Sequence, residues 1–170
     1  MTTFFVDWDT IPEYQRTSLG LRKDEPARAL ATVWFHATDT SDWLSRLDES
    51  KERTGKTPMV HLGTQRSAED RALDRHFARR GDWFLYAVTL TPKTLIYPAV
   101  YFDQEEAWGH AERQLEIDGY HGLIYLNDYE DNGSLSLMVN ADHINVIALE
   151  VRSAPWDSCP ALKNRVRSYA

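Results

Sequence analysis

The chain alternates short runs rich in β-branched and aromatic residues with segments of helical period, and this alternation limits the folds open to it. The runs with the composition of β-strands are residues 31–36, 59–62, 83–90, 95–97, 123–126, 135–139 and 144–149. Such runs are typical of strands that pack against a hydrophobic core. The sequence Asp131-Asn132-Gly133 separates two of the late runs and predicts a hairpin turn between them.

Three other segments place apolar residues on one face of a helix: residues 41–55, 67–81 and 103–119. In the second, Ser67 is expected to cap the helix and Gly81 to end it. Because helices interrupt strands without a regular βαβ order, we expect an α+β fold with about three helices and two small, mostly antiparallel sheets.

The chain's 170 residues fit one domain, and 42% hydrophobic residues are enough for a core. We divide it into an irregular N-terminal arm (1–30), a body (31–152) and a C-terminal tail (153–170). A single cysteine, Cys159, excludes an internal disulfide. The N-terminus lacks a signal-like stretch, and no apolar run is long enough for a membrane span, so we expect a cytoplasmic protein without a membrane partner.

Several common functional motifs are missing from the sequence. The six histidines include no His-Glu-x-x-His pattern, so no metal site is expected. No glycine-rich phosphate-binding loop is present, which argues against a Rossmann or P-loop nucleotide site. The formal charge of −7 also weighs against nucleic acid as a partner, although it does not exclude one.

The most basic feature is a stripe of three arginines, Arg71, Arg75 and Arg79, spaced four residues apart on one predicted helix. Asp70 and Asp74 interleave with them, which favours a solvated face laced with ion pairs. The alternative is a surface that docks a macromolecule.

Polar residues follow strand-like runs at three places in the chain. His36 ends the first run, His61 lies in the second and precedes Gly63-Thr64, and Glu130 follows a buried run at 123–126. Polar groups at strand ends often face a shared cleft. From the residues alone, the pattern indicates an enzyme or ligand site.

The three segments also resemble a known family. They read His36-Ala37-Thr38, His61-Leu62-Gly63-Thr64 and, over residues 119–130, GYHGLIYLNDYE. In this order they resemble the ADP-ribosyltransferase fold, in its histidine-containing branch related to diphtheria toxin and the poly-ADP-ribose polymerases. Small transferase-like domains of bacteria and their phages are more similar still. The resemblance covers roughly residues 33–148.

The resemblance implies an NAD-binding cleft between the two sheets. His36 would bind the adenosine ribose, the backbone of Ala37 would hold the nicotinamide amide, and His61 would stack on the nicotinamide ring. Thr38, Thr64 and Asn127 belong to the same segments and would complete the NAD site. Glu130 would be the catalytic carboxylate, so the catalytic set is Glu130 with His36 and His61.

The implied reaction is transfer of ADP-ribose from NAD to a macromolecule, most simply a protein, in conflict between bacteria and phages. The arginine stripe and the N-terminal arm would dock the target. Two residues differ from the family pattern, since Ala37 stands in place of a glycine and His121 in place of an aspartate. A catalytically silent binding module, and the same chemistry on DNA, RNA or water, are the alternatives.

Overall fold

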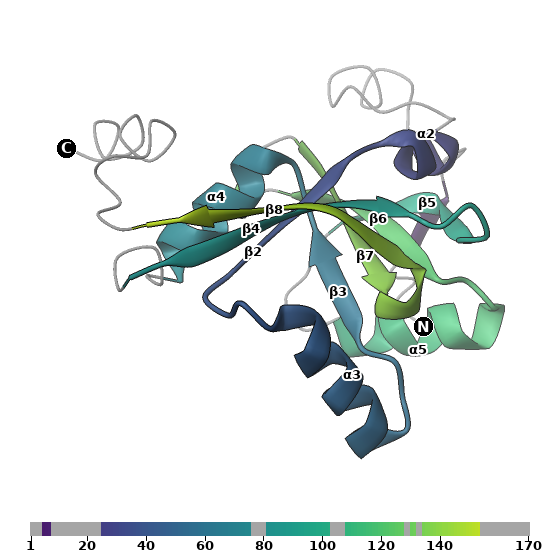
Figure 1. The fold of residues 1–170 in the computed structure, drawn as a ribbon. Coiled ribbons are helices and arrows are strands. Elements are labelled where there is room, and N and C mark those ends of the chain that lie inside the picture. Colours follow the sequence, from purple (N-terminus) through teal and green to yellow (C-terminus); the bar gives the residue numbers. More distant parts are fainter. Residues whose placement is uncertain are drawn as a thin grey trace.

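The structure is a computed structural model that describes residues 5–7, 25–75, 81–102, 108–127, 130–131 and 134–153. Over these residues it has four α-helices, one short 3-10 helix and two β-sheets (Figure 1). The helices are α2 (Glu25–Ala31), α3 (Trp43–Thr54), α4 (Gln65–Asp74), α5 (Trp108–Asp118) and the 3-10 helix η3 (Ala141–His143). None of these helices is long and apolar enough to cross a bilayer.

The larger sheet has five strands in the order β1 (Phe5–Asp7), β5 (Ile96–Phe102), β6 (Gly122–Asn127), β7 (Ser134–Asn140) and β3 (Met59–Leu62). The smaller sheet has the order β2 (Trp34–Thr38), β4 (Trp83–Leu90) and β8 (Ile144–Arg152). Every pairing is antiparallel except that of β5 with β6. That pair is parallel because the chain returns through α5, as a parallel connection requires. The expected α+β class with mostly antiparallel sheets is therefore confirmed.

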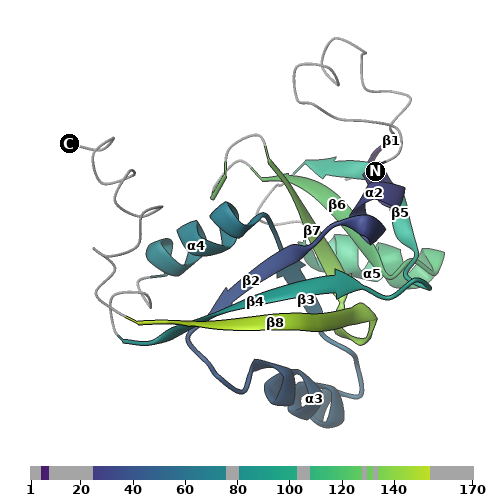
Figure 2. The same ribbon diagram turned by 45° about the horizontal axis from the view of Figure 1, so that its top comes forward.

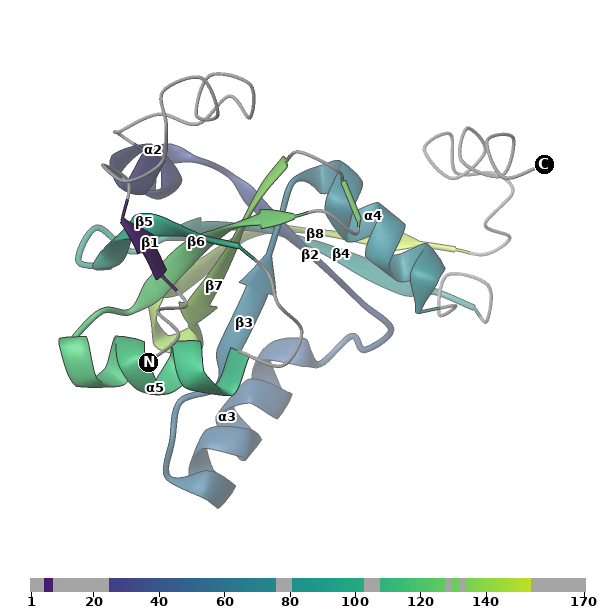
Figure 3. The same cartoon turned by 180° about the vertical axis from the view of Figure 1, so that it is seen from behind.

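The main core lies between the two sheets. Ile124, Leu137 and Val139 of the larger sheet pack with Tyr86 and Val88 of the smaller one, and all five are buried. The opposite face of the larger sheet is covered by α5 (Figure 3). Because side chains alternate along a strand, the neighbouring positions of β6 and β7 supply this second core.

The smaller sheet is covered on both faces near β2, with α4 on one side and α3 on the other (Figure 2). His36 pairs with Tyr86 on the side of α3, where Trp43 packs against both rings. Ala37 faces the other side and packs in a cluster with Ala68 of α4. The alternation along β2 thus points His36 and Ala37 to different layers.

The structure differs from the sequence expectations at two helices, and part of a third predicted helix is not described. Residues 25–31 form α2 instead of an irregular arm, because Ala29 is buried in the main core and its carbonyl accepts the indole N–H of Trp34 at 2.9 Å. Helix α4 begins at Gln65, and Thr64 rather than Ser67 is its N-cap, since the Thr64 hydroxyl accepts the Ser67 N–H. Residues 103–107 of the third predicted helix lie outside the described residues.

The predicted hairpin is present, because β6 and β7 pair antiparallel from Gly122↔Val139 to Asn127↔Ser134. At its tip the Ser134 N–H donates to the Asp131 carbonyl at 2.8 Å. Asn132 and Gly133 lie outside the described residues, as do residues 8–24 of the predicted arm and 154–170 of the predicted tail.

Candidate functional site

A small cleft, with a cavity volume of about 20 Å³, opens where the edge of β2 approaches the end of β3. Its lining comes from both sheets, from α4 and from the segment after β6. The lining residues are Phe35, His36, Ala37, His61, Leu62, Gly63, Ser67, Ala68, Arg71, Tyr125, Asn127, Glu130 and Ser136. We call this group of residues the cleft.

A short backbone bridge between the two sheets forms the floor of the cleft. The N–H of Phe35 donates to the Gly63 carbonyl at 2.9 Å, and the N–H of Gly63 returns a bond to the Phe35 carbonyl at 3.0 Å. A Cβ at Gly63 would lie 1.9 Å from the Ser67 hydroxyl oxygen. Glycine is therefore required here for close approach of α4, and the bridge fixes His36 and His61 beside each other.

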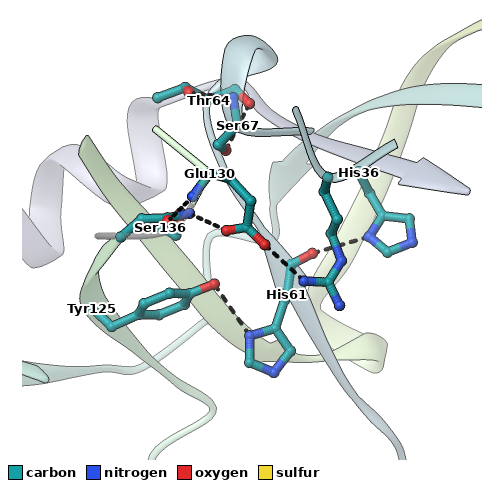
Figure 4. Close-up of polar contacts among 9 residues, drawn as sticks. His36, His61, Thr64, Ser67, Tyr125, Glu130 and Ser136 are labelled. Atoms are coloured by element: carbon teal, nitrogen blue, oxygen red, sulfur yellow. Dashed lines mark hydrogen bonds and ion pairs between the residues drawn. The ribbon is translucent and has the colours of Figure 1, made fainter. Parts of the chain in front are cut away.

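Glu130 reaches into the cleft and is held there by Asn127 (Figure 4). The amide nitrogen of Asn127 donates to Oε2 of Glu130 at 2.7 Å and to the Ser136 hydroxyl at 2.9 Å. The Glu130 N–H in turn donates to the Asn127 side-chain carbonyl at 2.9 Å. Asn127 is buried at the end of β6, so the carboxylate is fixed to the rigid sheet rather than left on a free turn.

Arg71 holds the other oxygen of the same carboxylate. Its Nη1 lies 2.9 Å from Oε1 of Glu130, and the side chain is 40% exposed against 17% for Glu130. Arg71 is in the last turn of α4 and is the one arginine or lysine among the described residues that line the cleft. This position differs from the predicted outward stripe: Arg75 is an exposed residue that does not line the cleft, and Arg79 lies outside the described residues.

His36 is held by stacking and by one hydrogen bond. Its ring lies parallel to that of Trp43, with centroids 4.1 Å apart. Its Nδ1 is 3.0 Å from the backbone carbonyl of His61, which can only accept, so Nδ1 carries the proton. Burial lowers the pKa of His36 to about 4, and the positive charge of Arg71 acts in the same direction, against the hydrogen bond to His61. His36 is therefore neutral at pH 7, with Nε2 as an acceptor.

His61 projects from β3 into an aromatic corner. Its Nδ1 lies 3.2 Å from the Tyr125 hydroxyl, and its ring meets the Trp108 ring edge-on with centroids 4.8 Å apart. Burial lowers the pKa of His61 to about 4, helped by the charge of Arg71. The cleft thus presents two uncharged imidazoles beside one ion pair.

The structure brings together six of the residues singled out in the sequence: His36, Ala37, His61, Arg71, Asn127 and Glu130. Thr38 and Thr64 do not line the cleft. Thr64 caps α4 and donates to the Asp131 carboxylate at 2.8 Å, so it ties α4 to the segment after β6. Thr38 accepts the N–H of Thr40 at 3.3 Å, within the turn that follows β2.

Sequence reasoning missed Ser136, which fixes Asn127, and Trp43, which supports His36. Ser136 had a detectable signal, because it is a polar residue inside an apolar run. Trp43 had none, since its contact with His36 depends on how α3 folds back on β2. Among the described residues, no three His, Cys, Asp or Glu side chains are grouped to hold a metal ion.

This arrangement can stabilise a developing positive charge beside a carboxylate, and a neutral imidazole can accept a hydrogen bond from a hydroxyl. No protein-family model, curated protein or solved structure matches this chain. The functional argument therefore depends on the residues of the cleft.

Proposed function

We propose that this protein is an NAD-dependent ADP-ribosyltransferase that modifies a macromolecular target, most simply a protein. One observation carries the proposal: His36, His61 and Glu130, which come from three separate segments of the chain, line one cleft. These are the residues that the resemblance to the histidine-containing branch assigns to ribose binding, nicotinamide stacking and catalysis. Their convergence supports that interpretation.

The reaction would break the bond between C1′ of the nicotinamide ribose and the ring nitrogen. The bonding electrons leave with nicotinamide, and positive charge develops on the ribose. A nucleophile of the target then bonds to C1′, and its proton passes to water. Glu130 is suited to stabilise the charged ribose, because Asn127 orients its carboxylate before any substrate arrives.

The two histidines would bind the substrate as neutral groups. Nε2 of His36 is an unprotonated acceptor and fits a ribose hydroxyl, while Trp43 keeps the ring in place. His61 would present its ring to nicotinamide, steadied by Tyr125 and Trp108. The cavity of about 20 Å³ is far smaller than the roughly 300–1,000 Å³ typical of small-molecule sites. Binding of the nicotinamide ribose would therefore require the side chains that line the cleft to move apart.

Nicotinamide release from NAD tests the proposal. Glu130→Gln keeps the shape of the side chain and removes its charge, so we expect turnover to fall by roughly 10²-fold or more, the scale of losing one preorganised electrostatic group. Glu112→Gln, on the exposed face of α5, is the matched control and should behave like wild type. Equal release of nicotinamide by wild type and Glu130→Gln would refute the proposal that Glu130 is catalytic and that the protein is this enzyme.

A second candidate is a silent module that binds NAD without cleaving it. The ion pair of Glu130 with Arg71 favours it, because a carboxylate engaged by an arginine is not free to face a ribose. Calorimetric titration with NAD, followed by assay of the same sample for nicotinamide, separates the two. Binding without release would support the silent module.

A further inference from the structure

Strand β8 lies at one edge of the smaller sheet. The strand order is β2, β4, β8, so β8 pairs with β4 and with no other strand in the part of the chain that the structure describes (Figure 2). The cleft borders β2, at the opposite edge of the same sheet. An edge strand presents backbone N–H and C=O groups to which a further strand can bind. The outer edge of β8 is therefore a candidate interaction surface that is separate from the cleft.

The second half of β8 has an apolar face that the described residues leave uncovered. Ile147, Leu149 and Val151 are three of the seven large hydrophobic residues that the structure describes as exposed, and the last two are 47% and 56% exposed. Because side chains alternate along a strand, Glu150 and Arg152 lie on the other face, where they form an ion pair at 2.7 Å. The strand thus has one exposed apolar face and one charged face.

Symmetry and charge select one way for two copies of β8 to pair. In an antiparallel pair of identical strands related by a two-fold axis, one residue faces its own copy. An axis at Glu150 or at Arg152 would place like charges opposite each other. An axis at Leu149 would require a regular ladder through Ile147, which the pairing with β4 skips at a β-bulge. An axis at Val151 avoids both problems and places Glu150 of each copy opposite Arg152 of the other.

We propose that β8 is a dimerisation strand and that two copies of this chain pair antiparallel about a two-fold axis at Val151. Residues 149–153 of each copy form the ladder, which joins the two three-stranded sheets into one continuous sheet. On one face Val151 meets its own copy with Leu149 beside it, and on the other the Glu150–Arg152 pairs of the two copies meet. The proposal does not depend on the proposed enzyme activity.

The interface is small, so we expect a weak dimer. Five residues of each copy are fewer than the roughly 20–30 per side of a standard protein–protein interface. Backbone pairing and burial of the apolar face should give a dissociation constant between about 1 μM and 1 mM. Sedimentation equilibrium over this range of protein concentration measures it.

Charged substitutions at Val151 test the position of the axis, because this residue would face its own copy. Val151→Lys and Val151→Glu should each raise the dissociation constant by about tenfold or more, since apolar contact is lost and like charges meet. When the two variants are mixed in equal amounts, a lysine faces a glutamate. The mixture should therefore associate more tightly than either variant alone, by roughly threefold or more.

Two controls make the test specific. Leu149 would face Ser153 of the other copy and not itself, so a mixture of Leu149→Lys and Leu149→Glu should not regain association. Ile117→Lys makes a similar change at a position of α5 that is 76% exposed, and it should dimerise like wild type. Thermal melting verifies that each variant is folded.

Three results would overturn the proposal. The first is a wild type that stays monomeric over the whole range of concentration. The second is a dimer that Val151→Lys leaves intact or that Ile117→Lys weakens equally, since the interface would then lie elsewhere. The third is association regained by the Leu149 mixture and not by the Val151 mixture, which would contradict the axis at Val151.

Discussion

Two pairs of histidines lie at opposite ends of β6 and serve different parts of the molecule. His36 and His61 are in the cleft near Asn127, which ends the strand. His121 precedes the strand, and its ring stacks on that of His143 with centroids 3.8 Å apart. We call the first the cleft pair and the second the junction pair.

The junction pair fastens the two places where the chain passes between the sheets. Nδ1 of His121 accepts the Leu95 N–H at 2.9 Å, just before β5. Nδ1 of His143, at the start of β8, lies 3.3 Å from the hydroxyls of Thr91 and Thr94, which follow β4. The hydrogen bonds of the junction pair thus join segments that connect the two sheets, whereas the cleft pair borders a cleft.

The charges around the two pairs differ in sign. Burial lowers the pKa of both cleft histidines to about 4, and Arg71 adds to the effect. Burial also lowers the pKa of His143, as does His121, but the Asp142 carboxylate opposes them. Burial thus dominates at His36, His61 and His143, while the neighbouring charge adds to its effect in the cleft and opposes it at His143. This difference would suit the proposed role of the cleft, in which a neutral imidazole accepts a hydrogen bond from a ribose hydroxyl.

Acid should act most strongly on the cleft pair. In the unfolded chain these histidines are protonated below about pH 6.5, whereas in the folded protein they stay neutral until about pH 4. Stability from this source is complete above pH 6.5 and is lost as pH falls toward 4. Each tenfold difference in proton affinity between the folded and unfolded chain corresponds to about 1.4 kcal/mol. Because the pKa of both histidines is lowered from 6.5 to about 4, this is the largest effect on stability that we predict.

The measurement is urea unfolding between pH 7.5 and 4.5. The double variant His36→Asn with His61→Asn should lose less stability over this range than wild type, and His110→Asn, exposed on α5, is the control. A wild-type profile as flat as that of the double variant would show that the cleft histidines are not held neutral by the fold.

The second-largest effect that we predict is on the free energy of unfolding and comes from Gly63, two residues after His61. Gly63→Ala places a Cβ 1.9 Å from the Ser67 hydroxyl oxygen and strains the bridge that joins the sheets. We expect a loss of about 1–3 kcal/mol in the free energy of unfolding, as for overpacking. Gly109→Ala in α5, where the nearest atom to the new Cβ would be 3.9 Å away, should gain about 0.5–1 kcal/mol from helix propensity. Denaturant titration of both variants measures the contrast, and equal values would refute it.

Substituting one histidine from each pair should separate catalysis from stability. His36→Asn removes the Nε2 acceptor, and we expect kcat/KM for NAD to fall by up to about tenfold, the value of one neutral hydrogen bond. His121→Asn should leave kcat/KM unchanged and lower the melting temperature. If His121→Asn reduces turnover as much as His36→Asn, the division between the pairs is wrong.

Local sequence patterns predicted the α+β class and most strands of the two sheets. β-Rich composition marked the strands, and the hairpin sequence placed Glu130 after β6. The predictions that failed concern residues whose environment depends on segments distant in the sequence. Asp70 was expected on a solvated face, yet it is 1% exposed.

The pairing of Arg71 with Glu130 is another feature that sequence could not supply. Helical spacing grouped Arg71 with Arg75, but the two residues that meet are 59 positions apart. The bridge of Phe35 with Gly63, the hairpin of β6 with β7 and the bond of Thr64 to Asp131 bring α4 beside Glu130. Contacts of this kind depend on tertiary packing, which no local period encodes.

The smallest effect we predict concerns the charges that distinguish the pairs. Asp142→Asn removes the carboxylate that raises the pKa of His143, so that pKa should fall further, whereas Arg71→Gln removes a cation and should raise the pKa values of His36 and His61. Asp142 also binds Lys51 at 2.6 Å, but both side chains are about half exposed, so the loss of stability should stay below about 1 kcal/mol. Histidine titrations followed by NMR measure the opposite shifts directly. Shifts of the same sign in both variants would mean that burial alone, and not the neighbouring charge, sets the two pairs apart.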